Sequence, residues 1–406
     1  MNGCEKMSKE EAIKIFESVG LNEKAELIKY KDGDTVKIYK CNNYIDHFYG
    51  YLMPSTGYIK SYDLFKYKNG VILMAASEDD KHIPKKFIPQ PKLASIYKEA
   101  ERWSDLMGVD KVLTLNKIIE SGKYGEIIRI VEALHEKKIG QIADIINEEN
   151  KRIILIAAPS SSGKTSFATR LSIHLKVNNL NPISISLDNY FIDRDKTPLD
   201  EFGHLDYESI RAIDLKRFNK DLNDLLEGKE VQLPRYNFIT GKSEPGEILQ
   251  IDENQPIILE GIHGLNPMLT ASIPDNEKFK IYLSALTQLN LDDHNRIPTT
   301  DLRLIRRIVR DNQFRGHTAE MTIKGWPSVR RGEEKNIFPY QEQADVMFNT
   351  ACVYELSLLK AYAKPLLEQI DKTSEAYIEA KRLLKLLQYF VELDDLSDIP
   401  PTAIIR

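Results

Sequence analysis

The chain has 406 residues, of which 42% are hydrophobic and 29% are charged, and this composition is typical of globular proteins. Lysine and arginine total 56 against 61 acidic residues, a formal net charge of -5, which argues against a protein that coats nucleic acid through charge alone. No apolar run approaches the ~20 residues that a membrane helix needs, and the charged start lacks the apolar core of a signal peptide, so we expect a cytoplasmic protein without a membrane segment.

Residues 1–148 are expected to form a smaller α+β domain with connecting helices. Ser8 and Glu11 have the spacing of a capping box at the start of a helix over residues 8–19. The alternating segment 35–39 predicts a strand. Apolar periodicity then predicts three helices, over 92–106, over 115–136 with candidate breaks at Gly122 and Gly125, and over 139–150.

Aromatic and β-branched runs between Tyr49 and Met74, separated by Pro, Gly and Asn-Gly, predict hairpins. Together with the turn Pro54-Ser55-Thr56-Gly57, they make residues 39–107 resemble the editing-side domain of threonyl-tRNA synthetase. That family's His-x-x-x-His signature is missing, and we interpret Cys41 and His47 as ordinary surface or core residues. The resemblance therefore implies a non-catalytic relic or a binding platform.

The sequence that follows, residues 153–167, has the order strand, phosphate loop, helix. Successive backbone N–H groups of such a loop and the N-terminus of its helix bind phosphate, which predicts ATP or GTP as ligand. Lys164 is expected to reach the β- and γ-phosphates, and Thr165 to place its hydroxyl on Mg²⁺. Ala158 stands where the pattern has its first glycine. The predicted nucleotide-binding residues are Pro159, Ser160, Ser161, Ser162, Gly163, Lys164, Thr165 and Ser166.

Two later strands each end in a carboxylate. Asp188 follows the apolar run 182–187, and the carboxyl ends of parallel strands face the ligand crevice of an open α/β sheet. Asp188 is therefore the candidate general base, with a turn-capping aspartate as the alternative. Glu260 ends the strand 256–259 and is the candidate Mg²⁺ ligand with Thr165.

A row of arginines then lies on a predicted helix that begins near Asp301. Its members at helical spacing can share one face and clamp a transferring phosphoryl group, although a solvated basic helix is the ordinary explanation. The row consists of Arg303, Arg306, Arg307 and Arg310, followed by Arg315 in Phe314-Arg315-Gly316-His317.

Taken together, these motifs resemble the uridine kinase and phosphoribulokinase family over residues 153–349, including Leu233-Pro234-Arg235-Tyr236-Asn237-Phe238 and Gln343-Ala344-Asp345-Val346. The resemblance implies that Asp188 is the catalytic base, assisted by Lys164 and Arg310. It also implies a substrate site formed by Asp188, Phe191, Asp206, Tyr236, Arg307, Arg310 and Arg315, with Asp206 on the ribose hydroxyls and Tyr236 at the base.

The chain departs from this family's pattern at three places. It has Thr240-Gly241-Lys242 where a base-reading histidine is expected, His317 where the lid carries a second arginine, and Phe191 in place of a tyrosine. These departures weaken the expectation of a uracil nucleoside but leave the residues for phosphoryl transfer in place.

The end of the chain, residues 351–406, predicts two leucine-rich helices over 354–370 and 374–393. Their apolar stripes predict core packing or a seam for a partner helix, so a homo-oligomer is an open alternative. The tail beyond Asp398 contains Pro400-Pro401 and is expected to dock as an extended, strand-like arm.

The fold class expected is α/β, a P-loop NTPase-type parallel sheet flanked by helices in residues 149–350, with the smaller N-terminal domain before it and the helices after it. The expected activity is ATP- and Mg²⁺-dependent phosphorylation of a small-molecule hydroxyl, that of a nucleoside. Two alternatives remain: a kinase whose acceptor is a phosphosugar or pantothenate-like molecule, and a regulatory ATP-binding protein linked to tRNA. The acidic balance makes nucleic acid the less favoured partner.

Overall fold

The computed structural model describes residues 3–53, 55–68, 70–76, 83–84 and 86–405. Its centre is a parallel sheet of five strands in the order β12-β11-β6-β10-β7. The bounds are β6 Ile153–Ala157, β7 Ile183–Ser186, β10 Ile257–Glu260, β11 Lys278–Ser284 and β12 Val346–Asn349. All five residues of β6 are buried, which explains why this strand is a continuous apolar run rather than an alternating one. The predicted P-loop-type parallel sheet is confirmed.

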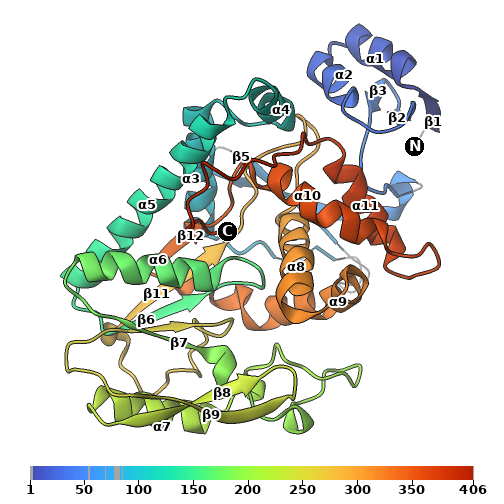
Figure 1. Ribbon diagram of the computed structural model, residues 1–406. Helices are drawn as coiled ribbons and strands as arrows, with labels where there is room; N and C mark the ends of the chain where they lie inside the picture. The colour runs from blue at the N-terminus through green and yellow to red at the C-terminus, as the bar shows by residue number, and fades with distance from the viewer. Residues whose placement is uncertain (1–2, 54, 69, 77–82, 85, 406) are drawn as a thin grey trace.

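Helices cover both faces of this sheet (Figure 1). Ile154 and Ile156 pack with α5 (Tyr124–Glu148) and α6 (Lys164–Val177) on one face. Ile153 and Leu155 point to the other face and pack with α7 (Leu215–Leu226) and the hairpin of β8 (Val231–Asn237) and β9 (Lys242–Leu249). The period-2 alternation of side chains along β6 thus divides the apolar residues between two cores.

A third core is helical. It joins α4 (Val112–Glu120) and the start of α5 to α8 (Thr299–Arg315), α9 (Ala319–Asn336), α10 (Glu355–Glu368) and α11 (Tyr377–Leu387). The predicted arginine helix is present as α8, and both α9 and α10 contact it. Short 3₁₀ turns complete the chain at Thr56–Tyr58, Leu187–Tyr190, Arg194–Lys196, Ile210–Ala212, Asp275–Glu277 and Phe338–Gln343.

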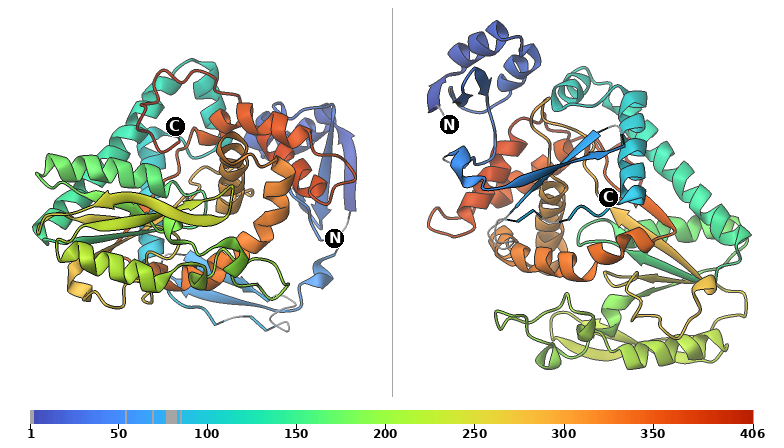
Figure 2. Two further views of the ribbon diagram at one scale, coloured as in Figure 1. Left: turned by 60° about the horizontal axis from the view of Figure 1, so that its bottom comes forward. Right: turned by 180° about the vertical axis from the view of Figure 1, so that it is seen from behind.

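The N-terminal part begins with a small module, which we define as residues 3–46. It consists of β1 (Gly3–Ser8), α1 (Lys9–Ser18), α2 (Asn22–Ile28), β2 (Thr35–Cys41) and β3 (Tyr44–Asp46), with a core of its own. Ser8 and Glu11 form the predicted capping box. The hairpin of β4 (Tyr62–Tyr67) and β5 (Gly70–Ala75) follows, and Figure 2 (right) shows it running across the back of the molecule toward α3 (Pro91–Met107).

Three predictions about local structure are wrong, and one of the two candidate helix breaks is confirmed. Residues 139–150 do not form a separate helix, because α5 continues through them from residue 124. Ile139 and Ile142 are buried on the same face of this helix as Ile128 and Val131. Gly122, with φ 72°, and not Gly125, marks the break before α5. Among the described residues of 49–61 there is no strand, only a 3₁₀ turn. The tail over 398–405 forms turns rather than a strand-like arm, although Ala403 and Ile404 are buried as docking requires.

Within the described part of the chain, no helix combines the length and the apolar character that crossing a membrane requires.

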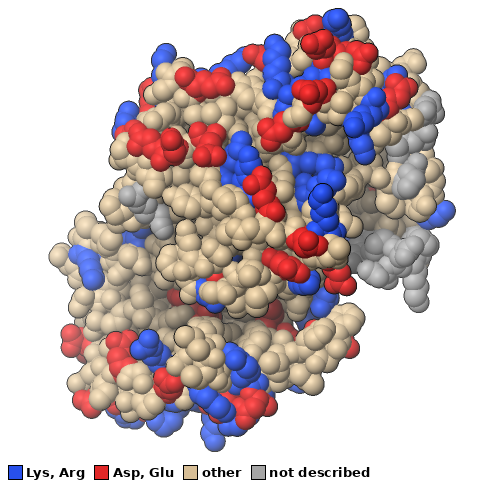
Figure 3. Space-filling view, turned by 45° about the vertical axis from the view of Figure 1, so that its right-hand side comes forward, with Lys and Arg blue, Asp and Glu red and all other residues tan. Residues whose placement is uncertain are grey.

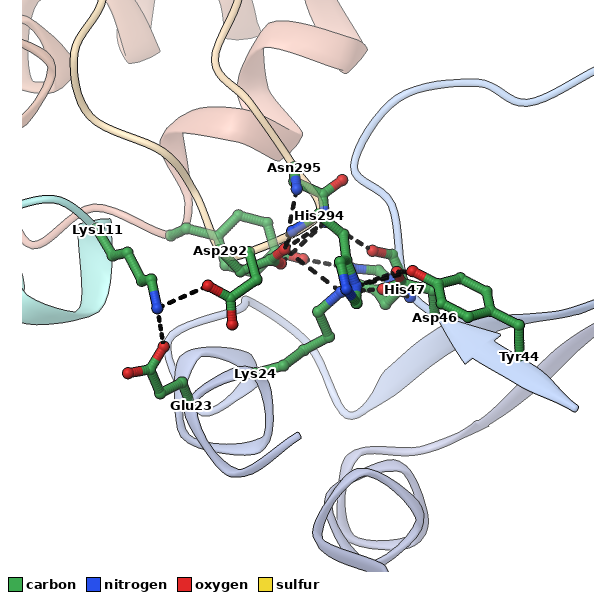
Figure 4. Close-up of polar contacts among 11 residues, drawn as sticks. Glu23, Lys24, Tyr44, Asp46, His47, Lys111, Asp292, His294 and Asn295 are labelled. Carbon is green, nitrogen blue, oxygen red and sulfur yellow. Dashed lines mark hydrogen bonds and ion pairs between the residues drawn. The ribbon is translucent and has the colours of Figure 1, made fainter. Parts of the chain in front are cut away.

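The N-terminal module is attached to the rest of the chain through buried charges (Figure 4). The Lys24 ammonium pairs with Asp46 in its own module and lies 3.4 Å from Oδ1 of Asp292, which belongs to the loop between β11 and α8. His294 of the same loop lies 2.7 Å from Asp46, and Nδ2 of Asn295 donates to the carbonyl oxygen of His47 at 3.1 Å. One ammonium thus bridges two buried carboxylates from different parts of the chain.

Replacing this ammonium tests how the module is held. Lys24→Ala leaves Asp46 and Asp292 buried without a cation, which we expect to cost about 3–5 kcal/mol. The measurement is amide hydrogen exchange in α2, which should accelerate by on the order of a hundredfold or more. The control is Lys40→Ala, which removes the exposed pair with Glu5 and should cost less than about 1 kcal/mol. Equal exchange in the two variants would show that the buried charges do not hold the module.

Candidate active site

The phosphate loop begins where β6 ends. Ser161 has φ 60° and Gly163 has φ 78°, so the backbone turns through the left-handed region twice before α6 starts. Gly163 is also packed closely, since a Cβ atom there would lie 2.5 Å from Cγ2 of Ile404 in the C-terminal tail. Glycine is therefore required at this position both for its φ and for its contact with the tail.

Three arginines of α8 hold this loop from the side. Arg303 Nε donates to the Ser160 carbonyl at 2.9 Å, and Arg306 Nη1 donates to the Ser161 carbonyl at 3.4 Å. Arg307 Nη1 donates to the Ser160 hydroxyl at 2.6 Å. The predicted clamp on a phosphoryl group therefore needs correction at all three positions, because these guanidiniums are engaged with the loop itself.

Buried acids hold Arg303 and Arg306 in place. Glu333 of α9 pairs with Arg303 and accepts the Ser160 N–H at 3.0 Å, and its side chain is fully buried. Glu355 of α10 pairs with Arg306, with 2.7 Å between Nη2 and Oε2. The loop is thus held through two helices that follow it far along the chain.

The P-loop opens into a cleft of about 490 Å³ that brings together most of the predicted chemistry. Four segments supply it: Lys164 and Thr165 start α6, Asp188 follows β7, Glu260 ends β10, and the last turns of α8 contribute the arginines. The strand-end residues meet because β7 and β10 are parallel neighbours. The described lining includes Ser161, Ser162, Gly163, Lys164, Thr165, Ser166, Asp188, Glu260, Arg306, Arg310 and Arg315, with Ile404 and Ile405 of the tail.

The residues present fit a nucleotide with Mg²⁺. The hydroxyls of Ser161 and Ser162 are buried in the loop and have no hydrogen-bond partner among the described residues, as expected of groups that await a ligand. The Thr165 hydroxyl donates to Glu260 Oε1 at 3.3 Å, so two oxygen ligands of the kind Mg²⁺ prefers lie side by side. Burial raises the pKa of Glu260, and the charge of Asp188 adds to this while Lys164 opposes it.

Glu208 is a site residue that the sequence did not reveal. Burial raises the pKa of its carboxyl to about 7, with opposing attraction from Arg307 and with repulsion from Glu333 and Asp188. Its Oε2 is buried without a hydrogen-bond partner among the described residues. The pKa of this carboxyl therefore depends on the charges around the phosphate loop. Its only sequence signal was its position two residues after Asp206.

The predicted nucleoside-contacting residues lie beside the cleft rather than in its lining. Phe191 packs against Tyr236 with ring centroids 5.6 Å apart, and the Arg315 guanidinium lies 5.7 Å from the centroid of Phe238 in the same aromatic group. The Tyr236 hydroxyl is buried without a hydrogen-bond partner among the described residues. Asp206 is not part of the cleft lining, and its Oδ1 accepts the Glu208 N–H at 3.2 Å.

Two further residues could not have been selected from sequence. Glu333 follows Arg330 and Arg331 and looks like part of a solvated charged face, yet it is fully buried beneath the phosphate loop. Ile404 stands in a tail without a recognisable motif and contacts Gly163.

Residues 153–357 match the model of the Phosphoribulokinase / Uridine kinase family. The chain belongs to this family. Among curated relatives, the uridine kinase of Ligilactobacillus salivarius is 30% identical over 203 residues, which cover 50% of this chain and 86% of that protein. The uridine kinase of Macrococcus caseolyticus is 30% identical over 199 residues, covering 48% and 86%.

Solved structures are similar over about half of the chain. A possible uridine kinase from Bacillus stearothermophilus has a TM-score of 0.33 at 18% identity and covers 49% of this chain and 89% of that chain. The D-glycerate 3-kinase from Cryptococcus neoformans has a TM-score of 0.36 at 11% identity and covers 50% and 89%. The family match lies outside residues 39–107, whose resemblance to threonyl-tRNA synthetase stays a prediction.

Glu208 leads to a pH prediction. Its pKa rises from the ordinary 4.5 to about 7 in the folded state, so between these values the folded protein holds a proton that the unfolded chain has lost. Stability therefore falls as the pH rises from about 4.5 to about 7, by up to about 3 kcal/mol. Glu208→Gln removes this loss. In urea unfolding without nucleotide, the free energy of unfolding of the variant should therefore increase relative to that of the wild type as the pH rises from 5 to 8. The exposed Glu253→Gln is the control. A constant difference between Glu208→Gln and wild type would rule out the raised pKa.

Proposed function

We propose that this chain is an ATP- and Mg²⁺-dependent phosphotransferase whose acceptor is a hydroxyl group of a nucleoside. The observation that carries the proposal is the single cleft in which Asp188 lies with Lys164, Thr165, Glu260, Arg310 and Arg315. Such a cleft combines a phosphate cradle, a carboxylate that can accept a proton, and cations that can balance charge on the transferring group.

In the proposed reaction Asp188 orients the acceptor hydroxyl and takes its proton as the oxygen attacks the γ-phosphorus and the bond to the bridging oxygen of ADP breaks. Lys164 and Arg310 stabilise the negative charge on the phosphoryl oxygens. Thr165 and Glu260 would hold Mg²⁺, which supplies charge neutralisation at the phosphates when bound. Ile404 and Ile405 cover part of the cleft with apolar surface, which excludes water and strengthens these charge interactions.

Support for a nucleoside acceptor comes from two sources. Curated relatives matched over about half of this chain include the uridine kinases of Ligilactobacillus salivarius and Macrococcus caseolyticus. The aromatic group of Phe191, Tyr236 and Phe238 borders the cleft through Arg315 and offers ring surfaces for a base.

A specific observation favours the second candidate, a kinase of a non-nucleoside acceptor. Asp206 and Tyr236, which the resemblance assigns to ribose and base, do not line the cleft, and an oxygen of Asp206 is already used by its own turn. A panel of uridine, cytidine, ribose and glycerate, measured by acceptor-dependent ADP release, separates the candidates. The proposal requires turnover with a nucleoside above that with the sugars and acids.

Asp188→Asn tests the chemistry in the same assay. The amide can still orient a hydroxyl but cannot take its proton, so we expect kcat to fall by about 10²- to 10⁴-fold while affinity for a non-hydrolysable ATP analogue is unchanged. Asp252→Asn, an exposed aspartate before β10, is the matched control and should keep full turnover. Full turnover in Asp188→Asn with nucleotide binding intact would refute the assignment of the base.

A further inference from the structure

A second group of basic residues lies outside the family's region, between α10 and α11. Lys360 and Lys364 are one turn apart on α10, and Lys381 and Lys385 are one turn apart on α11. All four line one hollow of about 160 Å³. Figure 3 shows Lys and Arg side chains (blue) close together, with Asp and Glu (red) among them, in the upper half of the face it displays. Like charges four residues apart on a helix repel each other, so this arrangement costs stability when nothing occupies the hollow.

The charges around this lysine hollow are not balanced by ion pairs. None of the four ammoniums has a carboxylate oxygen within ion-pair distance among the residues described. Lys360 donates to the Phe390 carbonyl at 2.6 Å, and Lys385 lies 4.9 Å from the centroid of the Tyr51 ring. The acidic residues in the lining are Asp32 and Glu368, with Glu392 acting on Lys360.

Two of the lysines are held partly out of water. Burial lowers the pKa of Lys360, and the charge of Lys364 lowers it further. Burial also lowers the pKa of Lys385, with added repulsion from Lys37 and Lys31 of the N-terminal module and from Lys381. Cations of α10 and α11 thus line one hollow, and two lysines of the N-terminal module add to the positive charge that acts on Lys385.

From this geometry we propose that the lysine hollow binds a small molecule through two linked phosphoryl groups. Ammonium groups are the donors that bind phosphate as point charges, and an anion there would relieve the repulsion within both helical pairs. The volume accommodates phosphoryl groups but is well below the ~300 Å³ of a pocket that encloses a whole drug-sized ligand, so the rest of the molecule would extend outward. Because the lysines converge on a hollow and the chain is acidic overall, a small ligand is favoured over an RNA strand, which needs an extended basic surface.

The lysine hollow is separate from the nucleotide cleft, but helix α10 lines both. Leu359 lines the nucleotide cleft, and the next residue, Lys360, lines the hollow. Glu355 on the same helix fixes Arg306 against the phosphate loop. A ligand in the hollow would therefore contact the helix that positions the nucleotide site.

Lysine-reactivity footprinting of the full chain, read by mass spectrometry with inorganic pyrophosphate as the probe, tests the proposal. We expect pyrophosphate to protect Lys364 and Lys381, whereas Lys372, an exposed residue in the turn joining the two helices, should stay reactive. Protection of Lys164 reports binding at the phosphate loop and is scored separately. Protection confined to Lys164 would overturn the proposal, as would protection of Lys364 and Lys381 by a 20-nucleotide RNA but not by pyrophosphate.

A charge-reversal variant gives the second readout. K364E/K381E should weaken pyrophosphate binding at the hollow at least tenfold, and K372E should leave it unchanged. Because K364Q/K381Q removes repulsion without adding a charge beside Glu368, this unliganded variant should unfold at a temperature no lower than the wild type. K364Q/K381Q serves as a milder pair if the reversed charges impair folding. Unchanged affinity in the folded double variant would contradict the site.

Discussion

The interaction on which the rest of the structure depends is the pairing of two arginines of α8 with two buried acids. Arg303 with Glu333, and Arg306 with Glu355, place guanidiniums where they donate to the carbonyls of Ser160 and Ser161. A buried ion pair gains stability only when its remaining hydrogen bonds are satisfied. Here the backbone of the phosphate loop satisfies them, so the same contacts that complete the helical core also shape the nucleotide site.

This constraint explains why the arginines along α8 have different roles. The arginines in its first turns hold the loop, while Arg310 and Arg315 near its end line the cleft that Asp188 and Glu260 enter from the sheet. The acids that fix the first group lie on α9 and α10, and the tail returns to place Ile404 against Gly163. Helices outside the parallel sheet are therefore part of the proposed active site, and α10 also lines the lysine hollow.

How much the sequence predicts depends on how local each feature is. The strand, loop and helix over 153–167 are set by neighbouring residues, and Asp188 and Glu260 were found because strand ends meet at one edge of a parallel sheet. The roles of Arg303 and Arg306 were missed because their partners lie 30 and 49 residues away and look like ordinary surface charges. The continuity of α5 was missed because apolar periodicity alone divided it into helices over 115–136 and 139–150, whereas tertiary packing against α6 joins the two. No local pattern marks Ile404 or Glu208 as neighbours of the loop.

The most direct test of this account compares two arginines of the same helix. Arg306→Lys cannot keep both the Glu355 pair and the loop contacts, so it should lower the unfolding temperature and weaken binding of an ATP analogue. Arg310→Lys should leave both nearly unchanged while acceptor-dependent turnover falls by about 10²-fold or more. The unfolding temperature, the affinity for the ATP analogue and the turnover are measured on both variants. If Arg310→Lys retains full turnover, or if Arg306→Lys changes neither stability nor nucleotide affinity, α8 does not divide its arginines between holding the loop and serving the reaction.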